Sequence, residues 1–267
     1  MTICGTKFSF DGISCDKYGL MMYELSDNTL SDGAFAGTVS IIDEPVVNGY
    51  KPIFYGIQYE KKLEFQIVFG VDMDRVDAGE YITADEMNNI ATWLIGHDKY
   101  KILTIDQPGF ENIRFKCIIT GLEQISYGNI PWALKATVTC DSPYAYRSPT
   151  SFRFQIDGVS TIEIENASGH NGYYRPVIEF NPTNGGDLII VNKTDNDRIV
   201  EFKGIPAAVL NMTLDSETLV IENSADLNLY DIYNKKGFRL KRGRNTLVVT
   251  GKGELVFHCE FPINVCG

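Results

Sequence analysis

The chain has 267 residues, of which 44% are hydrophobic and 22% charged, and its formal net charge is −11. This length exceeds what one hydrophobic core usually serves, so we expect two folded domains and no long disordered part. An acidic chain is poorly suited to hold nucleic acid by its phosphates, and no apolar run approaches the roughly 18 residues that span a bilayer. The N-terminal residues also lack the basic region and apolar core of a signal peptide, which favours synthesis in the cytoplasm.

The first half of the chain predicts an antiparallel sheet. Alternating or apolar runs predict strands at residues 8–13, 18–25, 61–70, 101–105, 114–122 and 132–140. Between the second and third of these, residues 26–50 are polar and rich in glycine. We expect a long loop or extended hairpin there that serves contacts with other molecules, because long segments of this kind are uncommon inside compact domains.

One helix is predicted in this half, and it begins after Thr83. Thr83 and Glu86 fit a capping box, in which each side chain bonds the other residue's backbone N–H. Apolar residues then follow at helical spacing, at Met87, Ile90, Ala91 and Leu94. Gly96 supplies a stop signal. One helix on a mostly antiparallel sheet indicates an α+β or barrel-plus-helix arrangement.

A stretch with two prolines separates the two halves. Pro143 and Pro149 exclude a helix and bias the preceding residues toward extended chain. We therefore expect an N-terminal domain at residues 1–142 and a C-terminal domain at residues 147–267. The charge is uneven across this hinge: residues 1–146 hold 20 acidic and 11 basic side chains, and the remainder hold 15 and 13.

The second half predicts short strands and no helix. The strands are expected at residues 152–156, 160–165, 175–180, 187–192, 198–202, 218–222, 227–231, 245–250 and 253–261. Short strands at this spacing, separated by glycine and asparagine turns, are typical of a β-sandwich. Residues 206–215 are expected to cross between strands as a loop, and Gly251 to Gly253 to form a turn, not a dinucleotide-binding loop.

No motif in the sequence predicts catalysis, a metal centre or a cofactor. There are three histidines, and the patterns HExxH, GxSxG and GxxxxGK[ST] are missing. His258 and Cys259 are neighbours on a predicted strand, so their side chains should point to opposite faces and cannot act as a pair. Asp72, Asp74 and Asp77 lie in one predicted loop, which could in principle hold calcium. The spacing of an EF-hand is absent, and a solvated acidic loop is the favoured interpretation.

Six cysteines are scattered along the chain without a CxxC pair. Cys117, Cys140 and Cys259 lie in apolar strand-like runs and are expected to be buried thiols. Structural disulfides are disfavoured because the chain is expected to be made in the cytoplasm.

Two stretches of the second half are candidate contact surfaces. The basic cluster is Lys235, Lys236, Arg239, Lys241, Arg242 and Arg244. A solvated hairpin that guards a sheet edge is the favoured interpretation, and contact with an acidic neighbour, such as the first half of another copy, is the alternative. Residues 170–175 mix polar donors with aromatic rings, as a sugar site could, although aromatic residues at a strand start more often serve packing.

Five motifs occur in order along the chain: Phe8 to Leu20, Ala91 to Pro108, Thr139 to Ala145, Tyr173 to Phe180 and Leu240 to Gly251. Together they resemble the distal tail protein (Dit) family of phages with long, non-contractile tails and of related prophage tail particles. The resemblance implies a mainly β protein. It implies an N-terminal split β-barrel-like domain with one α-helix, and a C-terminal galectin-like β-sandwich.

The resemblance also implies a non-enzymatic structural role at the virion tail tip. Such proteins form a hexameric ring that acts as a baseplate hub, with the tail tube protein on one face and the tail-associated baseplate or tail-fibre protein on the other. Receptor-binding proteins can attach at the periphery. DNA would pass through the ring without specific binding, and the acidic first domain would repel its phosphates. No cofactor and no membrane insertion are implied.

A carbohydrate-binding module for host adhesion is the alternative function. The second half has no tryptophan, and the His-x-Asn-Pro-Arg signature of sugar-binding galectins is missing. Direct carbohydrate binding by this domain is therefore disfavoured.

Overall fold

The structure, a computed structural model, describes residues 5–23, 39–59, 61–128 and 130–265. The chain forms two compact units, Met1–Arg147 with Ile263–Gly267 and Ser148–Pro262. The end of the chain, which the sequence assigns to the second domain, belongs to the first unit, because Ile263 and Val265 pack against the first hydrophobic core. Among the described residues, none of the helices is both long and apolar enough to cross a bilayer.

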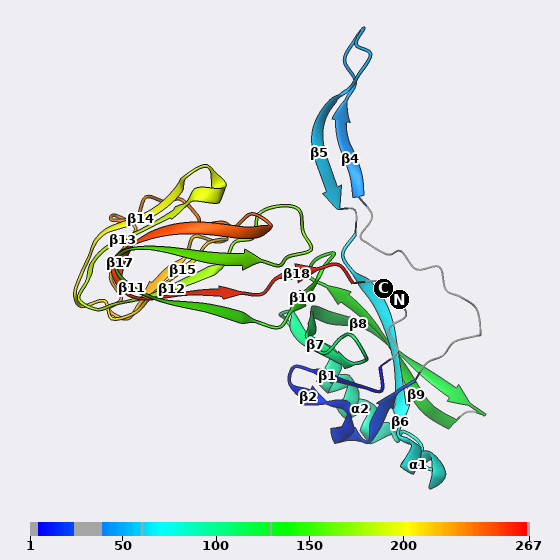
Figure 1. Cartoon of the computed structure of the whole chain (residues 1–267). Helices are drawn as coiled ribbons and strands as arrows, with labels where there is room; N and C mark the ends of the chain where they lie inside the picture. The colour runs from blue at the N-terminus through cyan, green and yellow to red at the C-terminus, as the bar shows by residue number, and fades with distance from the viewer. Residues whose placement is uncertain (1–4, 24–38, 60, 129, 266–267) are drawn as a thin grey trace. The chain divides into compact units, whose positions relative to one another are not determined.

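The first unit is built on one large antiparallel sheet (Figure 1). Its strand order is β2-β1-β7-β8-β9-β6-β3, and off this path β10 pairs with β8 and β18 pairs with β10. The bounds are β1 Lys7–Phe10, β2 Ile13–Ser14, β3 Leu20–Met22, β6 Glu64–Val71, β7 Lys101–Asp106, β8 Ile113–Tyr127, β9 Ile130–Cys140, β10 Ala145–Arg147 and β18 Pro262–Ile263. The Met22 N–H donates to the Thr6 carbonyl at 2.9 Å, so the last strand of the order curls back to the start of β1. This half-closed sheet confirms the expected split-barrel-like form.

The long helix α2 (Ala84–Leu94) is the predicted one. Thr83 is its N-cap, and both hydrogen bonds of the capping box with Glu86 are present. The buried face carries Trp93, whose Nε1 donates to the Phe10 carbonyl at 3.1 Å and whose ring stacks on Phe8. A short helical turn η1 (Cys15–Tyr18) lies between β2 and β3.

A second short helix, α1 (Met73–Asp77), corrects the prediction of an acidic loop. Asp72 is its N-cap and accepts a hydrogen bond from the Arg75 N–H at 3.0 Å, while Asp74 lies in its first turn. The Asp72 carboxylate, which the sequence suggested as a possible calcium ligand, therefore caps the N-terminus of a helix. The five residues of α1 contain only two apolar side chains, Met73 and Val76, and this pattern is too short to predict a helix.

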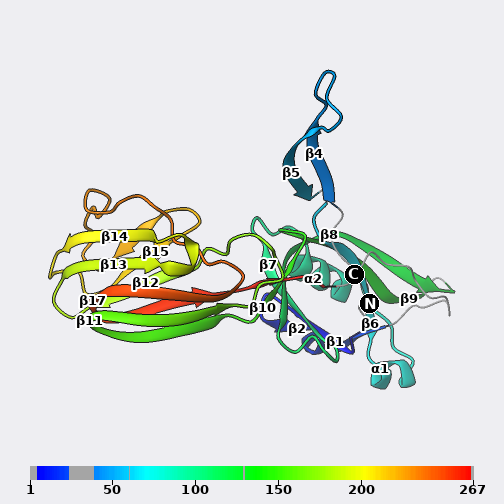
Figure 2. The ribbon, with the colours of Figure 1, turned by 45° about the horizontal axis from the view of Figure 1, so that its top comes forward.

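The second unit is a curled seven-stranded sheet around its own core (Figure 2). Its strands are β11 Thr150–Asn166, β12 Val177–Pro182, β13 Gly186–Asn192, β14 Arg198–Ile205, β15 Met212–Asp215, β16 Ile221–Asn223 and β17 Gly243–Cys259, with a helical turn η2 at Lys193–Asp195. Along one edge of β17, Leu247–Thr250 pairs with β13 and Gly253–His258 pairs with β12. The single long strand β17 therefore pairs with strands of both layers of the predicted sandwich.

Strands β11 and β17 each replace two predicted strands. They pair without a register shift along their whole lengths. The prediction of a turn at Gly251 to Gly253 is wrong, because all three residues pair with β11 in an unbroken ladder, within which Gly253 has φ of +146°. Gly158 of β11, with φ of +89°, is paired with Gly251 of β17. Glycine permits both conformations because it has no Cβ.

Two further expectations for this unit are corrected. Part of the expected crossing loop forms strand β15, which pairs with β12. Residues 227–231 form no strand, and a turn lies at residues 230–231. The mainly β class is confirmed for both units.

Candidate interaction surfaces

Strands β4 (Val39–Glu44) and β5 (Ile53–Tyr59) form a two-stranded sheet of their own, here called the apolar hairpin (Figures 1 and 2). They lie partly in the segment expected to be a long loop or extended hairpin. Residues 26–38 of that segment are outside the described part of the chain. The strand at 53–59 was not predicted, because its apolar residues are nearly continuous and do not alternate with polar ones.

The hairpin exposes nine large hydrophobic residues. They are between 42% and 92% exposed, and they are Ile41, Ile42, Val46, Val47, Tyr50, Ile53, Phe54, Tyr55 and Ile57. Ile41 lies directly opposite Ile57. Beyond a bulge in β5, Phe54 pairs with Asp43, two residues along β4 from Ile41, so these apolar side chains share one face. An isolated two-stranded hairpin is marginally stable in water, and exposed apolar patches mark interaction sites. This hairpin has the character of a docking element.

The base of the hairpin is attached to the hinge stretch between the two halves of the sequence. The hydroxyl groups of Tyr59 and Tyr144 are hydrogen-bonded, and the two rings meet edge to face with centroids 5.4 Å apart. Burial and this hydrogen bond raise the pKa of Tyr144. Tyr146 donates to the carboxylate of Asp141, so the hinge itself is held by its own polar side chains.

Residues 235–244, here called the basic loop, contain the predicted basic cluster. Phe238 and Leu240 are fully buried, so the alternating residues Arg239 and Lys241 are directed away from the core. Leu240 and Tyr174 exchange two backbone hydrogen bonds at 2.8 and 2.9 Å. The basic loop is therefore an extended segment that Phe238, Leu240 and the backbone bonds to Tyr174 attach to the second unit. The sequence-based prediction of a simple solvated hairpin is wrong.

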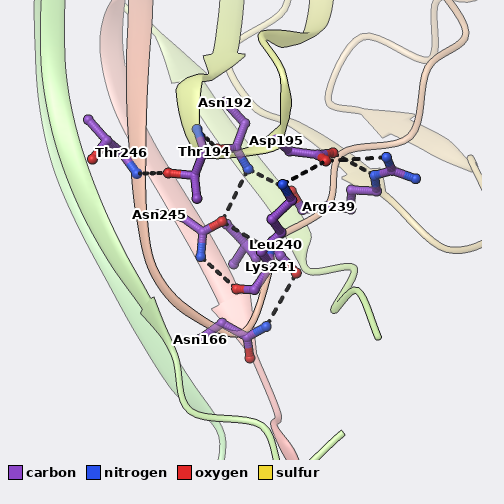
Figure 3. Close-up of polar contacts among 9 residues, drawn as sticks. All are labelled: Asn166, Asn192, Thr194, Asp195, Arg239, Leu240, Lys241, Asn245 and Thr246. Carbon is purple, nitrogen blue, oxygen red and sulfur yellow. Dashed lines mark hydrogen bonds and ion pairs between the residues drawn. The ribbon is translucent and has the colours of Figure 1, made fainter. Parts of the chain in front are cut away.

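Buried asparagines hold the backbone of this loop in place (Figure 3). Asn245 is fully buried, and its Nδ2 donates to the carbonyls of Lys241 and Gly243 at 2.7 and 2.9 Å. Its Oδ1 accepts from the Lys241 N–H at 2.9 Å. A single side chain therefore closes the turn that precedes β17.

Two more buried asparagines extend this framework. Asn192 donates to the Arg239 carbonyl at 2.9 Å and to Oδ1 of Asn245 at 3.3 Å. Asn166 donates to the Leu240 carbonyl at 3.3 Å. Since buried polar groups are costly unless they are hydrogen-bonded, these side chains fix one conformation of the loop.

Arg239 joins the loop to the helical turn η2. Its Nε and Nη2 donate to the carboxylate of Asp195 at 2.6 and 3.3 Å, and the Lys241 Nζ lies 4.0 Å from the same carboxylate. Burial alone would raise the pKa of Asp195, but hydrogen bonds and charge from Arg239, Tyr173 and Lys241 hold it below its ordinary value. The guanidinium lies over the Tyr173 ring, 3.7 Å from its centroid.

The basic loop also contacts the predicted sugar-site candidate at residues 170–175. Arg242 Nη1 donates to Oδ1 of Asn171 at 3.0 Å, in addition to the contact of Arg239 with Tyr173. The two stretches that the sequence offers separately therefore form one surface. They are about 70 residues apart in the chain, and no periodicity or motif links them.

Ser151, His258 and Glu179 form a row across strands β11, β17 and β12. His258 Nδ1 bonds Ser151 Oγ at 2.9 Å, and Nε2 bonds Glu179 Oε2 at 2.8 Å. In serine hydrolases the serine faces Nε2 and the acid faces Nδ1, the reverse of this order. We interpret the row as cross-strand pairing, while Cys259 points to the buried core as strand geometry predicts.

Within the described residues, no group of three or more histidine, cysteine, aspartate or glutamate side chains could hold a metal ion.

Comparison with models of known protein families assigns both halves of the chain. Residues 4–142 match the family described as phage tail protein N-terminal domain, and residues 144–259 match the one described as phage tail C-terminal domain. The chain belongs to this phage tail protein family. A search of curated protein sequences found no match.

This phage tail protein has the fold of the Dit (gp 19.1) protein of phage SPP1. That crystal structure is described as a paradigm of the hub adsorption apparatus in phages that infect Gram-positive hosts. The TM-score is 0.64 at 11% sequence identity, over 96% of this chain and 98% of that chain. The likeness therefore concerns the fold.

Proposed function

We propose that this phage tail protein is the structural hub of a tail tip. Copies close into a ring, six in number by the family resemblance, that joins the tail tube to the receptor-binding apparatus. Membership of a phage tail family and the Dit fold support this role. Homo-oligomers generally adopt closed symmetry, which suits a part that must surround a channel.

The observation that carries the proposal is the apolar hairpin. Its exposed side chains on both strands would be unfavourable on a solitary chain, and a neighbouring copy or tail ring would cover them. An apolar surface of this kind is typical of obligate assemblies, whose interfaces resemble a domain core cut in half. The hairpin would therefore contribute the main copy-to-copy contact.

The charge of the first half fits a ring around DNA. Residues 1–146 carry an excess of acidic side chains, which would keep phosphates from adhering as the genome passes. In this arrangement the protein is made in the host cytoplasm, is built into the virion tail, and acts without catalysis.

Electron microscopy of purified variants tests the hairpin's role. The triple substitution Ile41→Ser, Phe54→Ser and Ile57→Ser removes the shared apolar face while leaving both strands in register. We expect rings from the unmodified protein and separate molecules from this variant. The control Val159→Ser with Leu210→Ser changes two apolar residues of the second unit that are 71% and 70% exposed, and should leave the rings intact. Rings formed equally well by the triple variant would refute the assignment.

A further inference from the structure

The basic loop has far more positive charge than its surroundings neutralise. Residues 235–244 contain six basic and no acidic side chains. Asp195 pairs with Arg239 and lies 4.0 Å from Lys241, and Arg244 reaches Glu163 at 3.5 Å on the surface. Within the described part of the chain, Lys235, Lys236 and Arg242 make no ion pair. The second unit therefore presents an excess of cations at one place.

Hydrogen-bonding and aromatic groups adjoin these cations. Arg239 donates two of its five N–H groups to Asp195, and its guanidinium also interacts with Tyr173. Tyr173, under the guanidinium, is 39% exposed, and Asn171 is exposed beside Arg242. The surface thus combines groups that bind anions with an amide and an aromatic ring that can contact hydroxyl-bearing units.

The conformation of this surface is fixed before any ligand arrives. Three buried asparagines bond the carbonyls of Arg239, Leu240, Lys241 and Gly243. A loop that is already ordered loses little conformational entropy on binding.

We propose that the basic loop, together with Asn171 and Tyr173, binds a chain of sugar or polyol units linked through phosphate. Arginine recognises phosphate through its planar fork, and tyrosine and asparagine contact the hydroxyl-bearing units. A neutral glycan would not need the cations. A nucleic acid is the competing phosphate polymer, and a DNA duplex is therefore included in the test. This inference goes beyond the ring-forming role and does not depend on it.

Calorimetric titration of the full chain with purified poly(glycerol phosphate), at about 0.15 M salt where long-range charge effects are screened, tests the proposal. The variant Lys241→Gln with Arg242→Gln should weaken binding about tenfold or more. Tyr173→Leu, which keeps every charge, should weaken it about threefold. The matched control Arg153→Gln with Lys203→Gln removes two exposed cations from the same unit, and its affinity should stay within about twofold of the unmodified protein.

Several outcomes would overturn the proposal. The unmodified protein could fail to bind the polymer, or the control could lose as much affinity as the loop variant. A DNA duplex or polyglutamate that binds as tightly as the polyol phosphate would reveal a general charge effect. If the polymer does not bind and the loop variant instead changes the mass of the assembled particle, the loop is a contact between copies.

Discussion

Arg239 donates two hydrogen bonds to Asp195, from Nε at 2.6 Å and from Nη2 at 3.3 Å, and the side chain of Asp195 is 1% exposed. The pair connects the basic loop to the turn after β13. It makes the loop part of the folded core of the second unit, although its cations face outward.

Removing Arg239 should destabilise the second unit. Arg239→Met removes both guanidinium hydrogen bonds from the buried Asp195 carboxylate and leaves only the weaker contacts of Lys241 and Tyr173, so the free energy of unfolding at pH 7 should fall by about 3 kcal/mol. Arg244→Met is the control, because Arg244 is largely exposed and its ion pair with Glu163 is 3.5 Å long. The control should change stability by less than about 1 kcal/mol in urea unfolding. Equal losses in the two variants would contradict a special role for Arg239.

The same pair predicts a pH dependence. The pKa of Asp195 is lowered in the folded protein, so its stabilisation is present above the ordinary aspartate pKa of about 3.9 and is lost as pH falls through the folded pKa. In Arg239→Met the buried carboxylate lacks that partner. The stability difference between unmodified protein and variant should therefore be largest near neutral pH and shrink below about pH 4. A difference that grows on acidification would reverse the expected sign.

Of the three buried asparagines that hold the basic loop, Asn245 should contribute most to the free energy of unfolding. Asn245→Ala removes two donated and one accepted backbone hydrogen bond from a fully buried position, so we expect a loss of about 2–4 kcal/mol in the free energy of unfolding. Asn228→Ala is the matched control at an exposed turn and should cost less than about 1 kcal/mol. Amide hydrogen exchange should show faster exchange at the Lys241 N–H in the first variant. Unchanged exchange there would mean that Asn245 does not hold the loop.

Cysteine reactivity tests the predicted burial of the thiols. Burial raises the pKa of Cys140 and of Cys259 to about 12, and burial also raises the pKa of Cys117. Because the thiolate is the reactive form, alkylation at pH 8 should spare all three in the native protein and modify them after unfolding. Mass spectrometry of peptides gives the extent at each site. Rapid native labelling of Cys140 or Cys259 would place them outside the core.

Local signals predicted the parts of the fold that depend on local interactions. The capping box at Thr83 and Glu86 was predicted, because hydrogen bonds within a few residues determine it. The buried Cys117, Cys140 and Cys259 followed from apolar strand patterns. The hinge stretch, the acidic first half and the family resemblance came from composition and motif order.

The missed features depend on contacts between distant residues. Gly158 and Gly253 look like turn signals, yet the ladder between β11 and β17 continues past them, and only the partner strand reveals this. The second strand of the apolar hairpin, at residues 53–59, was not predicted because its apolar residues do not alternate with polar ones. Nothing in the sequence places Asn171 beside Arg242 or Tyr173 under Arg239, since tertiary packing alone brings those segments together.

The molar mass of the purified full chain in solution, measured by light scattering over a range of concentrations, tests the central claim most directly. The ring-forming hub predicts a particle of about six times the chain mass of 29.9 kDa. A mass of one chain at every concentration would contradict it, because the apolar hairpin would then remain uncovered in water.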